Sequence, residues 1–135
     1  MRHIYLDACM VIDLVEGHKS QQDLLKLRIT GKTVYSSELV RLEVRVKAIR
    51  ENRQDYLKRY EAYFDHCRLV SFDRTLFDLA TQLRVDHRLK TPDSLHLAAA
   101  LLAHCDEFWT NDQRLVAAAS RQLNVVDWQM LGLDP

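Results

Sequence analysis

The sequence predicts an α/β fold of three layers, α/β/α, with a parallel sheet of about five short strands between two layers of helices. Short apolar, β-prone segments alternate with longer segments of helical periodicity, which is the pattern of strand–helix–strand units. The 135 residues include only 3 Gly and 2 Pro, so long loops should be few and helix abundant. No linker, repeat or low-complexity tract interrupts this pattern, and the length suits a single domain over residues 1–135.

The first half of the chain is expected to hold two strands and four helices. Residues 3–6 are apolar and β-prone and end at Asp7, and Gly31 stands where a helix should stop. Ser37 and Glu38 supply a capping hydroxyl and a first-turn acid for a long helix. The expected strands are residues 3–6 and 33–35, and the expected helices are residues 11–15, 21–29, 37–50 and 54–67.

The second half is expected to hold three strands and three helices. Asp73 caps the first of these helices, and Thr91-Pro92-Asp93 opens the second with a cap, a proline in the first turn and an acid. A short third helix should begin at Asn111 and Asp112 and end near Ser120. The expected strands are residues 69–72, 107–110 and 124–128. Because crossovers between parallel strands are right-handed, strand ends of one polarity should line the same edge of the sheet.

Composition narrows the possible functions. The 19 basic and 19 acidic residues sum to a net charge of zero, which gives no global attraction for nucleic acid. No apolar run is long enough to span a bilayer, and the chain opens directly on a strand-like segment, so we expect neither a membrane span nor a signal peptide. The 3 Cys include no C-x-x-C pair and are expected to be reduced thiols of a cytoplasmic protein.

Three aspartates that lie far apart in sequence are expected to meet at one edge of the sheet. Asp7 follows the first strand and Asp112 follows the fourth, so both should lie at the carboxyl ends of strands, where ligands bind in such sheets. Asp93 begins a helix that leads into the fourth strand and therefore starts at the same edge. Taken singly, each could be an ordinary helix-cap, first-turn or loop acid, but their convergence predicts a site.

A fourth carboxylate could come from either of two glutamates in the helix at residues 37–50. Glu43 lies at the border of the apolar stripe and should point toward the sheet. Glu38 has a local role in the first turn of the helix. Helical periodicity alone does not decide between them.

A cluster of carboxylates on one concave edge predicts a divalent metal ion. The carboxylates repel one another, and a hard cation relieves that repulsion. Mg²⁺ or Mn²⁺ prefers oxygen ligands and keeps some of its waters. Such an ion can activate a water, neutralise a scissile phosphate and stabilise the leaving oxygen.

The histidine and the basic residues near these acids each have two interpretations. His96 lies one turn after Asp93 and could join it as a metal ligand, although a histidine among apolar neighbours more often packs in the core and donates one hydrogen bond. The basic residues could cradle phosphates beside the acids or could form solvated helix faces. They fall into two groups, namely Arg41, Arg45, Lys47, Arg50, Arg53, Lys58 and Arg59, and then Arg84, Arg88 and Lys90 just before Asp93.

Four segments, taken in this order, resemble the motifs of PIN domains. The opening strand and acidic turn match at YLDACMVI (5–12), the second motif at SELVRLE (37–43), the third at TPDSLHLA (91–98) and the fourth at WTND (109–112). Order and spacing match along nearly the whole chain. The closest resemblance is to the compact VapC-type toxins of bacterial toxin–antitoxin pairs.

The resemblance implies a Mg²⁺- or Mn²⁺-dependent endoribonuclease that hydrolyses RNA phosphodiester bonds. Asp7 and Asp93 would be the main metal ligands, and the other two acids would bind metal or position water. The implied acidic quartet is Asp7, Glu43, Asp93 and Asp112.

One departure from the family pattern follows the first acid. The family often has Thr or Ser there, and this chain has Ala8, so a hydroxyl that would help to position the acid is missing. Thr110 could serve as a hydroxyl neighbour of Asp112.

The resemblance also implies two protein partners, a cognate antitoxin and a second copy of the chain in a homodimer. Helices 37–50 and 54–67 carry apolar residues on more than one face, which fits an interface, although these residues could simply fill the core. An amphipathic partner helix is expected in the groove between the two helices. In the first helix the expected core residues are Leu39, Leu42, Val46 and Ile49, with Val40 and Val44 off that stripe, and in the second the crowded aromatic residues are Tyr56, Tyr60, Tyr63 and Phe64.

Other families with an aspartate after the first strand fit less well. A haloacid-dehalogenase-type phosphatase needs a second Asp two positions on, where Cys9 stands. A receiver domain needs a late Lys, and Lys90 is the only Lys beyond mid-chain. A metal-dependent HD hydrolase needs an adjacent His-Asp pair, which the sequence lacks. The remaining alternative is a catalytically idle PIN-like module that binds RNA or protein, which the presence of all four acids disfavours.

Overall fold

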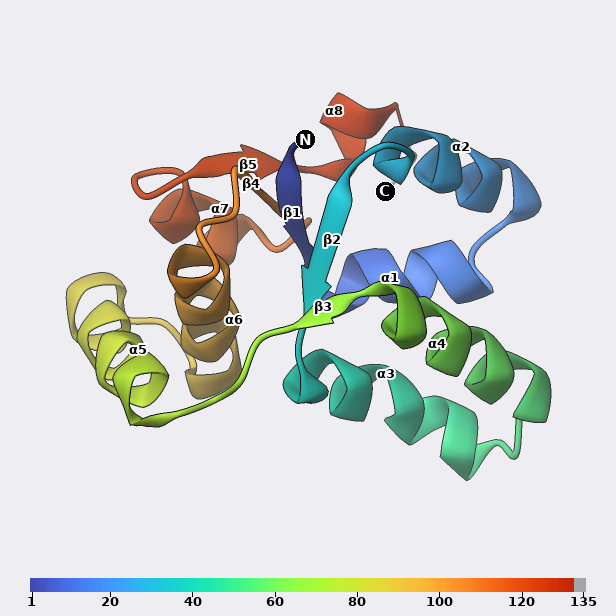
Figure 1. Cartoon of the computed structure of the whole chain (residues 1–135), viewed down its shortest axis with the longest axis horizontal. Coiled ribbons are helices and arrows are strands. Elements are labelled where there is room, and N and C mark those ends of the chain that lie inside the picture. The colour runs from blue at the N-terminus through green and yellow to red at the C-terminus, as the bar shows by residue number, and fades with distance from the viewer. Residues whose placement is uncertain (133–135) are drawn as a thin grey trace.

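The computed structural model describes residues 1–132, and at its centre is a five-stranded sheet in which every strand is parallel to its neighbours (Figure 1). The strand order is β3-β2-β1-β4-β5, which puts the first strand of the sequence in the middle. Residues 133–135 of the expected domain lie outside the described residues. The strands are β1 (His3–Leu6), β2 (Thr33–Ser36), β3 (Arg68–Leu69), β4 (Glu107–Trp109) and β5 (Asn124–Val126).

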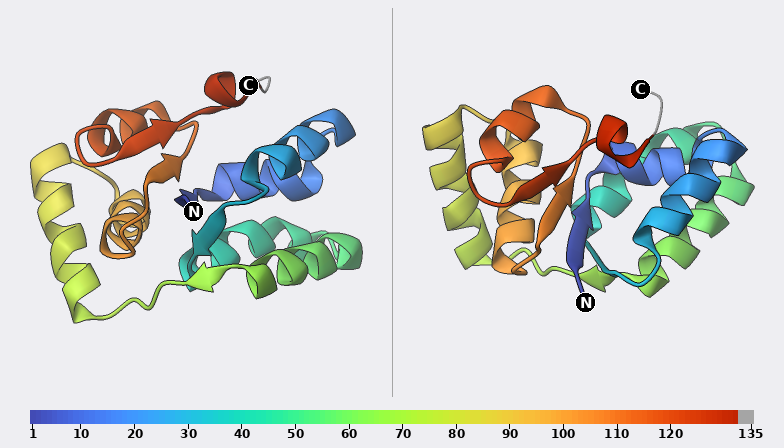
Figure 2. Two further views of the ribbon diagram at one scale, coloured as in Figure 1. Left: turned by 45° about the horizontal axis from the view of Figure 1, so that its top comes forward. Right: turned by 90° about the horizontal axis from the view of Figure 1, so that it is seen from above.

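Helices cover both faces of the sheet and complete the three expected layers (Figures 1 and 2). From β1 the chain moves outward through β2 to β3, and the helices of these connections, α1 to α4, lie on one face. The chain then crosses to β4 on the other side of β1, and α5, α6 and α7 lie on the opposite face. The helices are α1 (Ala8–Glu16), α2 (Lys19–Ile29), α3 (Glu38–Arg50), α4 (Gln54–His66), α5 (Arg74–His87), α6 (Thr91–Leu102), α7 (Gln113–Ala119) and α8 (Trp128–Leu131).

The core lies between the sheet and these two helical layers. The central strands contribute fully buried side chains, including Tyr5 of β1 and Phe108 of β4, whose rings stack with centroids 5.6 Å apart. Helix α6 is buried along residues 94–100 because it lies between the sheet and α5. That burial fixes the first turn of α6, which carries Asp93, at the edge of the sheet.

The side of α3 that faces the core differs from the expected one. Val40 and Val44 are 0% and 1% exposed, whereas Leu42, Val46 and Ile49 are 55%, 46% and 57% exposed. The expected stripe was therefore wrong in all but Leu39, which is partly buried against the core. The physical reason is that α3 carries two apolar stripes, and the second one includes the small Ala48, which lets the helix approach α4 and α1 closely.

Element bounds follow the local capping groups. Helix α1 begins at Ala8, earlier than expected, because Asp7 is its cap. Strand β3 ends at Leu69, shorter than expected, although Val70 N still donates to Ser36 O at 2.9 Å. The short helix α8 was not expected, and the backbone oxygen of its Leu131 lies 3.4 Å from Arg28 Nε of α2.

Within residues 1–132, no helix combines the length and the apolar character needed to cross a membrane.

Candidate active site

The carboxyl ends of β1 and β4 lie where the sheet changes its winding direction. After β1 the chain turns into α1 on one face, and after β4 it turns toward α7 on the other. Backbones that diverge in this way leave a crevice, and ligands of open α/β sheets bind there. Asp7 and Thr110 are the first residues after these two strands, and Asp7 N donates to Trp109 O at 2.9 Å.

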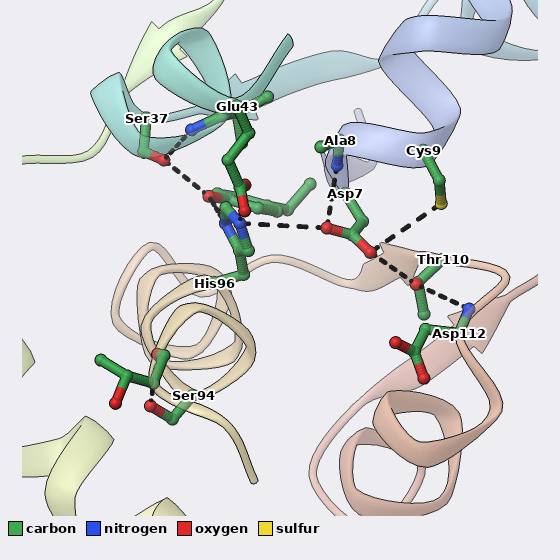
Figure 3. Close-up of polar contacts among 12 residues, drawn as sticks. Asp7, Ala8, Cys9, Ser37, Glu43, Ser94, His96, Thr110 and Asp112 are labelled. Atoms are coloured by element: carbon green, nitrogen blue, oxygen red, sulfur yellow. Dashed lines mark hydrogen bonds and ion pairs between the residues drawn. The ribbon is translucent and has the colours of Figure 1, made fainter. Parts of the chain in front are cut away.

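Asp7 is held in this crevice by groups on both sides of it. Its Oδ1 accepts from Ala8 N at 2.8 Å, and its Oδ2 accepts from the Thr110 hydroxyl at 2.8 Å (Figure 3). The Cys9 thiol lies 3.8 Å from Oδ2 and remains neutral, since burial and the Asp7 charge raise its pKa to about 12. The three cysteines of the chain are all free thiols, as expected.

Thr110 links two of the expected site residues. Besides donating to Asp7, its hydroxyl oxygen accepts from Asp112 N at 3.2 Å. The hydroxyl that the chain lacks at Ala8 is thus replaced by one from the neighbouring strand. Sequence reasoning connected Thr110 with Asp112 but not with Asp7.

Asp112 and Asp93 both stand at the start of helices. Asp112 caps α7, where its Oδ1 accepts from Arg114 N at 3.0 Å and Leu115 N at 3.4 Å. Asp93 lies in the first turn of α6. Each aspartate therefore stabilises the start of a helix and also lies at the edge of the sheet where the site is expected.

The other three acids affect the pKa of Asp93. The pKa of Asp93 is raised first by burial, then by the negative charges of Asp112 and Asp7 and, more weakly, of Glu43, while His96 lowers it. Burial is the largest cause of this rise in pKa, and the neighbouring carboxylates add to it. The metal site itself stays a prediction.

The two candidate glutamates of α3 lie in different surroundings. Glu43 Oε1 lies 2.5 Å from His96 Nε2, and the same nitrogen lies 3.9 Å from Asp7 Oδ1. Glu38 lies on the outside, where its side chain is 70% exposed and pairs with Arg41 at 3.5 Å. Glu43 is thus the glutamate at the crevice, which helical periodicity left open.

His96 is more deeply embedded in the site than the sequence suggested. Its side chain is 1% exposed, and its Nδ1 lies 2.9 Å from the Tyr5 hydroxyl. Its Nε2 faces Glu43 (Figure 3). The sequence signal for this placement was its spacing of one helical turn after Asp93. That spacing could not reveal the contacts with Tyr5 and Glu43, which come from other elements.

The donor set suits a hard divalent cation. Four carboxylates offer only oxygen atoms, which Mg²⁺ and Mn²⁺ prefer, and their mutual repulsion would be relieved by a positive ion. Within residues 1–132, no three metal-ligating side chains converge closely enough to form a metal cage as they stand.

Basic side chains border the site on the α6 side. A pocket of about 360 Å³ beside Asp93 is lined by Arg88, Lys90 and Arg114, together with His87 and Leu89. Two members of the second expected basic group, Arg88 and Lys90, thus lie next to Asp93, and α7 adds Arg114. The third member, Arg84, bonds Leu89 O and the Thr91 hydroxyl instead. Within the first group, Arg41 pairs with Glu61 at 2.8 Å and Arg53 pairs with Asp55 at 2.8 Å, so these two cations are already neutralised.

Comparison with known proteins gives a family and a fold. Residues 4–120 match the family model of the PIN domain. No curated protein sequence matches the chain. A chain in the structure of VapBC2 from Rickettsia felis bound to a promoter DNA fragment aligns with a TM-score of 0.71 at 15% identity, covering 93% of this chain and 98% of that one.

Two further solved structures share this fold. VapBC-1 from nontypeable Haemophilus influenzae contains a chain that aligns with a TM-score of 0.72 at 14% identity, covering 94% of this chain and 98% of that one. A toxin–antitoxin complex from Klebsiella pneumoniae contains one that aligns with a TM-score of 0.68 at 22% identity, covering 84% and 90% of the two chains.

Proposed function

The chain belongs to the PIN domain family, and on that basis we propose that it is a Mg²⁺- or Mn²⁺-dependent endoribonuclease and the toxin of a toxin–antitoxin pair. One observation carries the proposal: Thr110 bonds both Asp7 and the backbone of Asp112, and His96 lies between Asp7 and Glu43. Asp93 lies in the first turn of the same helix as His96. Such a pocket binds a divalent cation, and the cation makes it a site for phosphodiester hydrolysis.

Asp7 and Asp93 are the proposed main ligands, and Glu43 and Asp112 complete the acidic quartet. When bound, the metal would supply an activated water and charge stabilisation at the phosphate. The chain itself orients the acids. Thr110 fixes Asp7 from one side, and the α7 backbone amides fix Oδ1 of Asp112.

RNA is the proposed substrate, held by its backbone. Arg88, Lys90 and Arg114 border the pocket beside Asp93, and cations of this kind bind phosphates without reading sequence. Acids in the crevice and bases around it reconcile a net charge of zero with a polyanionic substrate.

The decisive experiment is cleavage of mixed RNAs by the purified protein, with and without Mg²⁺, followed by mapping of the ends. Attack by an activated water leaves a 5′-phosphate and a 3′-hydroxyl, whereas a primary 2′,3′-cyclic phosphate would contradict the mechanism. Metal-stimulated cutting separates a nuclease from the alternative, a catalytically idle module that binds RNA or protein. Asp65→Asn, an exposed acid on α4, is the matched control for the site variants.

An antitoxin is the proposed inhibitor, since the structural neighbours described above are toxin–antitoxin complexes. A groove of about 600 Å³ lies along α1, α2 and α4, with Leu14, Val15 and Tyr63 forming its apolar lining. Its basic side chains are Lys19, Lys26, Arg59 and His66. The groove expected between α3 and α4 stays a prediction. The groove along α1, α2 and α4 is a second candidate docking site, and it fits a partner segment that alternates apolar and acidic residues.

Coexpression with the product of the neighbouring reading frame tests this partner. The partner should bind and inhibit the chain, and the double variant Lys26→Glu, Arg59→Glu should escape inhibition while still cutting RNA. Growth that does not slow on expression, with a neighbour that does not bind, would contradict the toxin assignment.

We also propose a homodimer formed through the exposed stripe of α3, Leu42, Val46 and Ile49.

A further inference from the structure

A buried histidine lies inside the acidic site, and the proposed chemistry assigns it no task. His96 is 1% exposed and comes from α6, yet it contacts a strand on one side and Glu43 of α3 on the other. Burying a polar ring is costly unless both nitrogens have partners. Here each nitrogen has one, so the ring is fully satisfied.

The partners form a continuous chain of hydrogen bonds through the core. The Ser37 hydroxyl lies 2.8 Å from the Tyr5 hydroxyl, which lies 2.9 Å from His96 Nδ1, and His96 Nε2 lies 2.5 Å from Glu43 Oε1. Ser37 Oγ also accepts from Val40 N at 3.3 Å as the cap of α3. The chain therefore begins and ends on α3 and passes through β1 and α6 on the way.

Only one direction of donation satisfies every group in this chain. A carboxylate oxygen can only accept, so in this contact His96 Nε2 carries the hydrogen. With Nδ1 accepting, Tyr5 donates to the ring and the Ser37 hydroxyl donates to Tyr5. In the reverse direction the Ser37 hydrogen would have no other acceptor within residues 1–132.

Tyr5 is suited to its place in the middle of this chain. Its side chain is fully buried and stacked on Phe108, so it cannot turn away. Burial raises the pKa of Tyr5 well above its ordinary value, so the hydroxyl keeps its hydrogen at every physiological pH.

We propose that His96 is a positioning residue that fixes the Glu43 carboxylate at the edge of the site, through a one-way chain of hydrogen bonds from Ser37 through Tyr5. Glu43 has a flexible side chain on a partly exposed helix face, and Asp7, near the same His96 nitrogen, repels it. A donated hydrogen from His96 offsets that repulsion and removes the rotamer freedom that metal binding would otherwise have to overcome.

The inference rests on the proposed function only where it concerns metal binding, and its first test needs no activity. Long-range ¹⁵N–¹H NMR spectra of the metal-free protein report which imidazole nitrogen carries hydrogen, and His96→Gln identifies the signal of His96 among the six histidines. We expect the Nε2–H form in the wild type. A His96 ring protonated at Nδ1 alone would overturn the proposal.

Substitutions at His96 test its effect on Glu43. Mn²⁺ binding to the metal-free protein is measured by the electron paramagnetic resonance of free Mn²⁺. Removing a partner that orients a metal ligand typically costs ~10–100-fold in affinity, so we expect His96→Leu to weaken binding by at least ~10-fold. His96→Gln keeps a donor at the Nε2 position and should bind within ~3-fold of wild type, by the same principle. His18→Gln, an exposed histidine, is the control.

A second pair of variants covers the case in which His96→Leu does not fold. His96→Asn keeps an acceptor for Tyr5 but is too short to reach Glu43, so it should bind Mn²⁺ as weakly as His96→Leu. Equal binding by the Asn and Gln variants would overturn the proposal. A wild type that has the Nε2–H form but neither binds Mn²⁺ nor cuts RNA would refute the proposed function and leave the hydrogen-bond chain standing.

Discussion

Asp7 illustrates how one residue serves both the fold and the site. It caps α1, pairs its backbone with β4 and accepts the Thr110 hydroxyl. These contacts use the carboxylate as an acceptor, which an amide can partly reproduce. The negative charge itself is needed only for the metal.

Asp7→Asn should therefore separate activity from folding. A bound metal stabilises the transition state by several kcal/mol, and ~1.4 kcal/mol is a factor of ten, so RNA cleavage should fall by at least ~10²-fold. The free energy of unfolding of the metal-free protein should stay unchanged or rise slightly, because one repelling charge is removed. Cleavage rates and urea unfolding measure the two effects, with Asp65→Asn as the control; full activity at matched metal would contradict the ligand role.

Asp93 gives the site a pH-dependent effect on stability. Its pKa is raised in the folded chain, so the folded state binds more protons than the unfolded state between the ordinary pKa and the raised one. The contribution of Asp93 to the free energy of unfolding is complete below its pKa in the unfolded state, ~3.9. That contribution is lost as pH rises through its pKa in the folded state. At neutral pH the ionised Asp93 is thus destabilising.

Asp93→Asn should stabilise the metal-free protein at pH 7 and lose that gain toward pH 4. The gain should be at most ~1 kcal/mol, since solvent screens a partly exposed group. Melting temperatures between pH 4 and pH 8, compared with wild type, measure it. Added Mg²⁺ should raise the melting temperature of the wild type more than that of the variant, and a gain that persists unchanged at pH 4 would contradict the electrostatic cause.

Among the site residues, topology alone predicted where the three aspartates lie, whereas the other side chains depend on tertiary packing. Asp7 and Asp112 follow adjacent strands and Asp93 starts a helix, so the order of elements sufficed. Periodicity left Glu43 and Glu38 open, because the rotation of α3 depends on packing against α1 and α4, and the resemblance to PIN domains selected Glu43. The contacts of His96 required the positions of three elements at once.

At the scale of elements, α3 shows the limit of periodicity most clearly. Two stripes on this helix both repeat at helical spacing, one with larger side chains, Leu42, Val46 and Ile49, and one with smaller ones, Val40, Val44 and Ala48. Hydrophobicity favours the larger set, but close contact with neighbouring helices selects the smaller. The order of the other elements was predicted correctly, except that the short helix α8 was not expected.

A pair of substitutions on α3 tests this assignment. Val44→Ala removes two buried carbons and should lower the free energy of unfolding by about 2 kcal/mol, from ~0.8 kcal/mol per carbon plus a cavity. Val46→Ala, 46% exposed, should change it by less than ~0.5 kcal/mol in the monomer. Urea denaturation at low protein concentration measures both free energies of unfolding. Equal losses in the two variants would mean that α3 does not bury the face that carries Val44.

At the scale of the whole molecule, the exposed stripe of α3 is the feature that a monomer does not explain. Leu42, Val46 and Ile49 are about half exposed and follow one another at helical spacing, so they form one continuous apolar face. A helix face of this kind pairs with its own copy across a two-fold axis, because each apolar residue then meets another.

The homodimer proposed above should therefore depend on this face. Val46→Glu puts two charges into the shared interface of the pair and should weaken dimerisation by at least ~30-fold, the effect of a hot spot of 2 kcal/mol. Leu27→Glu, on α2 and 67% exposed, introduces the same charge elsewhere and should leave the dimer intact. Sedimentation velocity over a range of protein concentrations distinguishes the two variants. A wild-type chain that stays monomeric at every concentration, or a Val46→Glu variant that dimerises as well as Leu27→Glu, would show that the stripe serves another purpose.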